Sequence, residues 1–229
     1  MIIYRRILND GRIIMNCRYE TVLFDFDGTF ADTGRGVFAG IEYAVKKLGR
    51  EPLTEQVLRT FIGPPLTVSF MHHLNLDESQ AADAIDIFKE YYSTEGVYKF
   101  DVYEGIPELI KELKADGVKV GIASTKPEVF INNILDSLNF SEYFDFISAP
   151  VSEERVEKSE LMLKALEALG AKKETAVMIG DRYFDIEGAI QAGIDCIGVT
   201  YGYGSYDELK KSGAAKIAGS ADEIRTFLF

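Results

Sequence analysis

The hydrophobic pattern of the chain separates a segment without strands from segments in which strands and helices alternate. Residues 21–26 form a short, nearly continuous apolar run bounded by polar residues. Such a run is typical of a strand that is buried on both faces of a parallel sheet. Further runs of this kind occur only after residue 100, at residues 118–123, 144–147, 175–179 and 196–200.

Helical periodicity accounts for most of the remaining chain. Apolar residues spaced three and four apart predict helices over residues 35–49, 54–62, 66–74 and 78–98, and then over 106–116, 127–138, 159–169 and 184–192. Strands that alternate with helices of this length favour a doubly wound parallel sheet with helices on both faces. We therefore expect an α/β core domain made of residues 1–33 and 101–229, with residues 34–100 inserted as an all-helical domain.

Polar residues that could take part in binding or catalysis follow the predicted strands. In open α/β sheets, ligands bind beyond the carboxyl ends of the strands. The candidates at this edge are Asp25, Asp27, Gly28, Thr29, Ser124, Thr125, Lys126, Lys158, Gly180, Asp181 and Asp185. Each of them alone has an ordinary explanation as a turn residue, a helix cap or a solvated charge. A lysine and two separate acidic pairs at one sheet edge favour a functional site instead.

This set of side chains suits phosphoryl transfer. Carboxylates bind Mg²⁺ together with a substrate phosphate, and a carboxylate can also attack phosphorus to form an aspartyl-phosphate. A second carboxylate two residues further on can serve as acid and base. A hydroxyl, a lysine and backbone N–H groups at a helix N-terminus can neutralise the phosphoryl oxygens.

The order of these residues resembles the four motifs of the haloacid dehalogenase superfamily. The stretch from Asp25 to Thr33 resembles the first motif in its phosphatase form, Ser124 the second, Lys158 the third, and Gly180-Asp181 with Asp185 the fourth. The helical block resembles the cap that phosphoglycolate phosphatases and β-phosphoglucomutases carry at the same point. Residues 182–185 and 198–204 are similar to a branch described as phosphoglycolate phosphatase-like or 5′-nucleotidase-like.

The resemblance implies a role for each residue. Asp25 would be the nucleophile and a metal ligand, and Asp27 the general acid and base whose backbone carbonyl also binds the metal. Asp181 and Asp185 would complete the metal site. The phosphoryl group would be bound by Gly28, Thr29, Ser124, Thr125 and Lys158. Because Lys158 is followed by Ser159 where the family usually has proline, Lys126 is the alternative for the third motif.

The function implied by the resemblance is a Mg²⁺-dependent phosphatase that hydrolyses a small phosphomonoester through an aspartyl-phosphate. Phosphoglycolate and nucleoside 5′-monophosphates are the first candidate substrates. A β-phosphoglucomutase-like hexose-phosphate mutase and a non-catalytic binding module on the same fold are the alternatives. We expect the cap to select the substrate, and the candidate segment is a loop that contains Phe61, Gly63 and Pro64. The alternative is that this segment is only a turn that connects two helices.

The composition of the chain limits the kinds of molecule that it is expected to bind. The chain of 229 residues has 37 acidic and 25 basic residues, a net charge of −12 that argues against binding a nucleic-acid polymer. A small phosphorylated metabolite needs only a local cation. Two distant cysteines, Cys17 and Cys196, suggest free thiols in the cytoplasm, and no apolar run approaches the ~20 residues that span a membrane. Residues 1–14 are either an extension before Met15 or an extra strand or arm, and the oligomeric state stays open.

Overall fold

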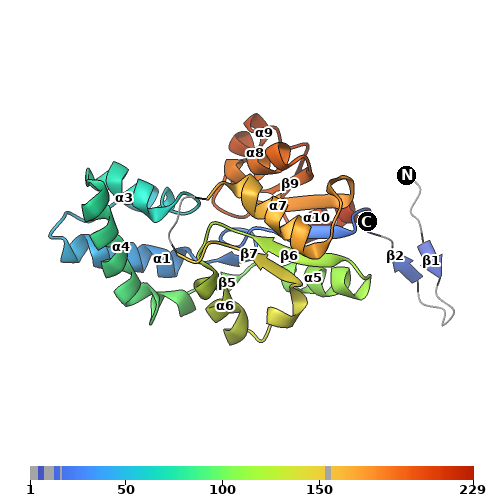
Figure 1. Cartoon of the computed structure of the whole chain (residues 1–229), viewed down its shortest axis with the longest axis horizontal. Coiled ribbons are helices and arrows are strands. Elements are labelled where there is room, and N and C mark those ends of the chain that lie inside the picture. Colours follow the sequence, from blue (N-terminus) through green and yellow to red (C-terminus); the bar gives the residue numbers. More distant parts are fainter. Residues whose placement is uncertain (1–4, 8–12, 16, 153–155) are drawn as a thin grey trace.

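The computed structural model describes residues 5–7, 13–15, 17–152 and 156–229. Its centre is a six-stranded parallel sheet in the order β10-β9-β8-β3-β6-β7 (Figure 1). The strands are β3 (Thr21–Phe24), β6 (Lys119–Ala123), β7 (Phe146–Ser148), β8 (Ala176–Gly180), β9 (Asp195–Val199) and β10 (Lys216–Ala218). The chain builds outward from β3 through β6 to β7 and then returns to β8 on the other side of β3. The first strand is therefore at the topological switch point, where sheets of this kind bind ligands.

Helices cover both faces of the sheet, as alternation along β3 requires. Val22 and Phe24 pack with α5 (Ile106–Ala115), α6 (Glu128–Ser137) and α10 (Ala221–Leu228). Leu23 points to the other face and packs with α7 (Lys158–Leu169), α8 (Tyr183–Ala192) and α9 (Tyr206–Lys211). The short 3₁₀ turn η2 (Ser141–Tyr143) connects α6 to β7, and η3 (Lys173–Thr175) connects α7 to β8. The predicted strand is thus buried on both sides.

A helical segment is inserted between β3 and β6, the first two strands of the central sheet along the chain. It contains α1 (Gly34–Lys47), α2 (Glu55–Arg59), α3 (Leu66–Leu74), α4 (Glu78–Tyr92) and the 3₁₀ turn η1 (Gly96–Tyr98). The chain leaves along β4 (Ala31–Asp32) and returns along β5 (Asp101–Val102), and these two strands pair antiparallel. The insertion forms a lobe beside the sheet (Figure 1). The predicted α/β fold with a helical insertion is confirmed.

Several predicted elements differ from the observed ones at their ends. The helix expected over residues 78–98 ends at Tyr92, and the Gly96 carbonyl then packs so tightly on α1 that a Cβ on Gly36 would lie 2.0 Å from its oxygen. The helix expected over residues 54–62 ends at Arg59, shortly before the two prolines at 64 and 65. The strand expected from residue 144 begins at Phe146.

The N-terminal residues include a small sheet of their own. β1 (Arg5–Ile7) and β2 (Ile13–Met15) pair antiparallel and are not part of the central sheet. Residues 1–4 and 8–12 lie outside the described residues. Within the part of the chain that the structure describes, no helix has the length and apolar character needed to cross a membrane.

Candidate active site

Asp25 and Lys158 form a buried ion pair at the carboxyl edge of the sheet. Asp25 directly follows β3 and continues its ladder by donating its N–H to Ile179 O at 2.9 Å. Lys158 is the first residue of α7, and its Nζ lies 2.6 Å from Asp25 Oδ1 and 2.8 Å from Asp185 Oδ1. All three side chains are buried. Lys158, not the alternative Lys126, therefore lies beside the predicted nucleophile.

Three carboxylates converge beside this lysine. Asp25, Asp181 and Asp185 each offer an oxygen, and these oxygens lie within 4.8 Å of one another. Backbone donors orient two of the carboxylates: Tyr203 N–H donates to Asp181 Oδ2 at 2.7 Å and Arg182 N–H donates to Asp185 Oδ2 at 3.0 Å. The three residues come from the ends of two neighbouring strands, β3 and β8, and from the first turn of α8.

The cluster contains three carboxyl groups and one ammonium group, that of Lys158. Burial raises the pKa of Asp181 well above its usual range, and the neighbouring carboxylates of Asp185 and Asp25 raise it further. Burial also raises the pKa of Asp185 to about 6, although the Lys158 ammonium opposes the shift. Burial alone would lower the pKa of Lys158, but the carboxylates of Asp185 and Asp25 outweigh this effect and raise it. Three buried carboxylates with one ammonium have the composition of a site for a divalent cation.

Asp27 lies in a different environment from Asp25. Its Oδ1 accepts a hydrogen bond from Thr33 Oγ1 at 2.6 Å. Lys126 Nζ lies 3.1 Å from Oδ1 and 3.2 Å from Oδ2, so the ammonium faces both oxygens. The same Nζ donates to Tyr92 Oη, at the end of α4, at 2.7 Å. Sequence reasoning missed this role of Tyr92, because no local pattern relates the end of α4 to the loop after β6.

The residues predicted to bind a phosphoryl group contact several parts of the site. Gly28 has φ +89°, and a Cβ there would lie 2.3 Å from Asp181 Oδ2, so only glycine fits. Thr29 donates through Oγ1 to Asp181 Oδ1 at 3.4 Å. Ser124 is buried and its Oγ accepts the N–H of Lys126 at 3.4 Å. Thr125 donates instead to Gly63 O, at 3.2 Å, and so contacts the insertion.

The loop between α2 and α3 lies over this site. Arg182 Nη1 donates to Ile62 O at 2.6 Å, which is a second contact between the sheet domain and this loop, after Thr125 with Gly63. Phe61 is buried, packs edge-on against Phe70 and also lines the cavity beside Asp27. Gly63 and Pro64 line two cavities. The loop predicted to select the substrate therefore lies against both cavities.

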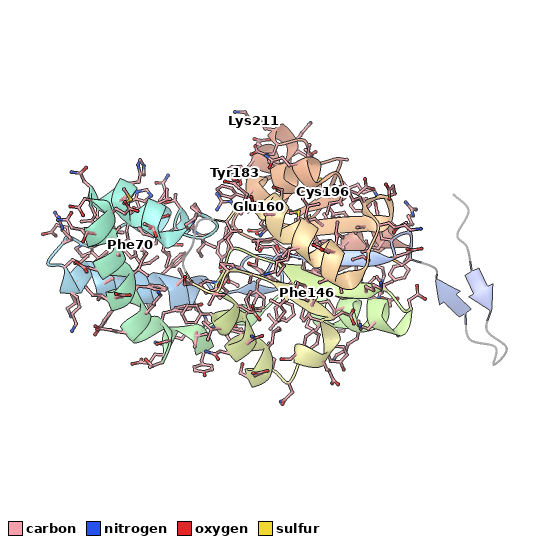
Figure 2. The ribbon with its side chains drawn as sticks, viewed as in Figure 1. Phe70, Phe146, Glu160, Tyr183, Cys196 and Lys211 are labelled. Atoms are coloured by element: carbon pink, nitrogen blue, oxygen red, sulfur yellow. The ribbon has the colours of Figure 1, made fainter. Side chains whose placement is uncertain are left out.

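The two cavities differ in size and surroundings. A chamber of about 50 Å³ lies beside Asp27, Lys126 and Tyr92. A wider cleft of about 360 Å³ lies next to Lys158 and is lined by Tyr183 and Phe184. Tyr183 is on the side of the sheet domain that faces the insertion (Figure 2). A substrate can therefore approach through the cleft, and only a small group fits beside Asp27 in this arrangement.

The fold and the acidic cluster define a phosphohydrolase of the α/β class with a helical insertion. Residues 22–199 match the haloacid dehalogenase-like hydrolases, and the chain belongs to this family. The resemblance seen in its motifs is therefore confirmed.

Known proteins with assigned activities are similar over most of the chain. A 5′-nucleotidase of Pseudomonas aeruginosa is 38% identical over 194 residues, which are 84% of this chain and 88% of that protein. A phosphoglycolate phosphatase of Pseudomonas putida is 26% identical over 190 residues, 80% of this chain and 70% of that protein. The crystal structure of a predicted phosphatase from Clostridium acetobutylicum, 38% identical, covers 91% of this chain and 97% of its own with a TM-score of 0.86.

Proposed function

We propose that this protein is a Mg²⁺-dependent phosphatase that hydrolyses a small phosphomonoester in two steps through an aspartyl-phosphate. The observation that carries the proposal is the buried group of Asp25, Asp181, Asp185 and Lys158 at the switch point of the sheet. It combines a nucleophile, a cation-binding carboxylate set and a fixed positive charge, which are the parts that phosphoryl transfer needs.

In this proposal, each side chain has a role that its position allows. An oxygen of Asp25 attacks phosphorus, and the bond from phosphorus to the leaving oxygen breaks while Asp27 gives that oxygen a proton. Asp27 then takes a proton from water as the water oxygen attacks phosphorus, and Asp25 is released as a carboxylate. Lys158 stabilises negative charge on Asp25 and on the phosphoryl oxygens.

The cation site is built from residues of the chain that fit Mg²⁺. Hard oxygen ligands are what this ion prefers, and the side chains of Asp25, Asp181 and Asp185 with the backbone carbonyl of Asp27 would hold it. Bound there, the ion would neutralise charge on the phosphoryl group. The backbone of Gly28 and Thr29, with Ser124, Thr125 and Lys158, would hold the remaining phosphoryl oxygens.

Residues 34–100 act in this proposal as a cap domain that covers the site and excludes bulk water. Gly63 and Pro64 of its loop line both cavities, which supports a role for them in substrate choice. Nucleoside 5′-monophosphates and phosphoglycolate are the substrates to compare first, because relatives with these activities are similar over most of the chain.

A phosphate-release assay with and without Mg²⁺ tests the proposal. The panel contains both substrate candidates and β-glucose 1-phosphate, and it is repeated with Asp25→Asn, which keeps the size of the side chain but removes the nucleophile. We expect Mg²⁺-dependent release by the wild type and none by the variant. Equal activity of Asp25→Asn would overturn the mechanism, and formation of glucose 6-phosphate in place of phosphate would identify a mutase.

A further inference from the structure

Lys126 is a buried cation to which the proposed chemistry gives no role. It is only 7% exposed, in the loop after β6. Its ammonium lies 3.1 Å and 3.2 Å from the two carboxylate oxygens of Asp27, whereas Lys158 is the lysine that contacts Asp25. Its charge therefore acts on the residue proposed as acid and base, not on the nucleophile.

Tyr92 connects this ion pair to the insertion. It is the last residue of α4, is almost fully buried, and accepts a hydrogen bond from Lys126 Nζ at 2.7 Å. Its ring stacks on Phe88 of α4 and meets the edge of Phe130 of α6, each at 4.9 Å between ring centroids. Because α4 belongs to the insertion and α6 to the sheet domain, this contact depends on the position of the insertion.

Thr33 holds the same carboxylate from another direction. It precedes α1, and its Oγ1 donates to Asp27 Oδ1 at 2.6 Å. The carboxylate of Asp27 is thus fixed by a hydroxyl at the start of the insertion and by an ammonium that the end of α4 holds. A group held on two sides keeps one orientation, which proton transfer to or from a reacting atom requires.

Removal of the Tyr92 hydroxyl would weaken this arrangement without removing a charge. An ammonium has three N–H donors, and a buried donor without a partner is unfavourable. Lys126 would then have to shift toward another acceptor, and the Asp27 carboxylate would lose its fixed partner. The burial of Lys126 strengthens this coupling, because bulk water has little access to the ammonium.

We propose that Lys126 and Tyr92 are positioning residues that fix the Asp27 carboxylate when the insertion covers the site. The inference rests on the proposed function, because it concerns the step in which Asp27 takes a proton from water and the bond between phosphorus and Asp25 breaks. The first step does not need Asp27 when the substrate is p-nitrophenyl phosphate, since p-nitrophenolate leaves without a proton. This substrate separates the two steps.

The experiment compares Tyr92→Phe with the wild type on p-nitrophenyl phosphate in the presence of Mg²⁺. We expect kcat to fall about tenfold, which is part of the usual contribution of a positioned base. We expect kcat/KM, which reports the first step, to stay within about twofold. The fraction of enzyme trapped as phosphoenzyme by acid quench should rise, and Lys126→Met should show the same split with a larger loss.

Tyr91→Phe is the matched control. Tyr91 is the preceding residue of α4, and its hydroxyl also accepts a hydrogen bond from a lysine, Lys99, but on the exposed side of the insertion. The same substitution there should change neither kcat nor the phosphoenzyme fraction. Thermal unfolding of each variant, with a melting temperature near that of the wild type, shows that the fold is retained.

Two outcomes would overturn the inference. If Tyr92→Phe lowers kcat and kcat/KM together, the hydroxyl has only a structural role. If it changes neither and no additional phosphoenzyme is trapped, Asp27 does not depend on it. Failure of the proposed function looks different: the wild type would release no p-nitrophenol, or Asp25→Asn would be as active as the wild type.

Discussion

The two buried lysines of the site differ in where their partners come from. Lys158 binds Asp25 and Asp185, which both belong to the sheet domain. Lys126 binds Asp27 of the sheet domain and Tyr92 of the insertion. Both lysines are less than a tenth exposed, and both keep a raised pKa because neighbouring carboxylates outweigh the effect of burial, helped by the Tyr92 hydroxyl at Lys126.

This difference divides the site into two parts. The contacts described above for Asp25 and the carboxylate cluster all come from the sheet domain, so this part of the site is preorganised independently of the insertion. The carboxylate of Asp27 is held partly by residues whose position depends on the insertion. The geometry therefore separates the group that forms the covalent bond from the group that moves the protons.

Substitution of Lys158 should have the largest effect and should sharpen this contrast. Lys158→Met removes the ammonium that is paired with the buried carboxylates of Asp25 and Asp185, and we expect kcat/KM on p-nitrophenyl phosphate to fall about 10²–10³-fold. Chemical denaturation without Mg²⁺ should show a loss of about 3–5 kcal/mol in unfolding free energy. Lys126→Met is the comparison, since it should retain kcat/KM on this substrate. Similar losses of kcat/KM in both variants would contradict the division.

The carboxylate cluster should respond to metal and pH in a way that the Asp27 region does not. Mg²⁺ at 100 times its dissociation constant should add about 2.7 kcal/mol of stability, a rise of roughly 5–10 °C in Tm. Burial raises the pKa of Asp185 from 3.8 to about 6, so the metal-free fold holds this proton more tightly than the unfolded chain does. That stabilisation is complete at low pH and is lost as pH rises to about 6.

Protons and Mg²⁺ therefore compete for the same carboxylate. The increase in Tm on adding Mg²⁺ should be larger at pH 8 than at pH 5, as differential scanning fluorimetry can measure. In Asp185→Asn the increase and its pH dependence should both shrink. An increase that is equal at the two pH values would show that the cation binds elsewhere.

The contact between the loop of the insertion and the sheet domain should have the smallest effect. Arg182→Ala removes the hydrogen bond to Ile62 O and the ion pair with Glu208, and we expect KM to rise about three- to tenfold, as for one or two hydrogen bonds. Hydrogen exchange of the loop at residues 61–63 should become faster. Arg59→Ala, which removes an exposed ion pair within α2, should change neither measurement.

Much of the sheet domain could be predicted because its signals are local. The run Val22-Leu23-Phe24 is apolar on both faces, and the acidic residues come directly after it in the sequence. The topology then brings Asp181 and Asp185 to the same edge without further information. The order of the motifs along the chain also predicts that Lys158 lies near Asp25.

The features missed by sequence reasoning depend on contacts between distant segments. Tyr92 reaches Lys126 across 34 positions, and the backbone of Tyr203 orients Asp181 from a loop 22 residues away. The end of α4 was also misplaced, because helical periodicity continues past Tyr92 while the packing of Gly96 on Gly36 ends the helix. Periodicity describes one element at a time, so it cannot show where two elements meet.

The close approach of Gly36 and Gly96 has a mechanical consequence. It joins the beginning of α1 to the end of the insertion, since a Cβ on Gly36 would lie 2.0 Å from the Gly96 oxygen. The segment that enters the insertion and the segment that leaves it are therefore in contact next to the β4-β5 pair. A rotation at that short ribbon would therefore carry both ends of the insertion together, and with them the loop at residues 61–63.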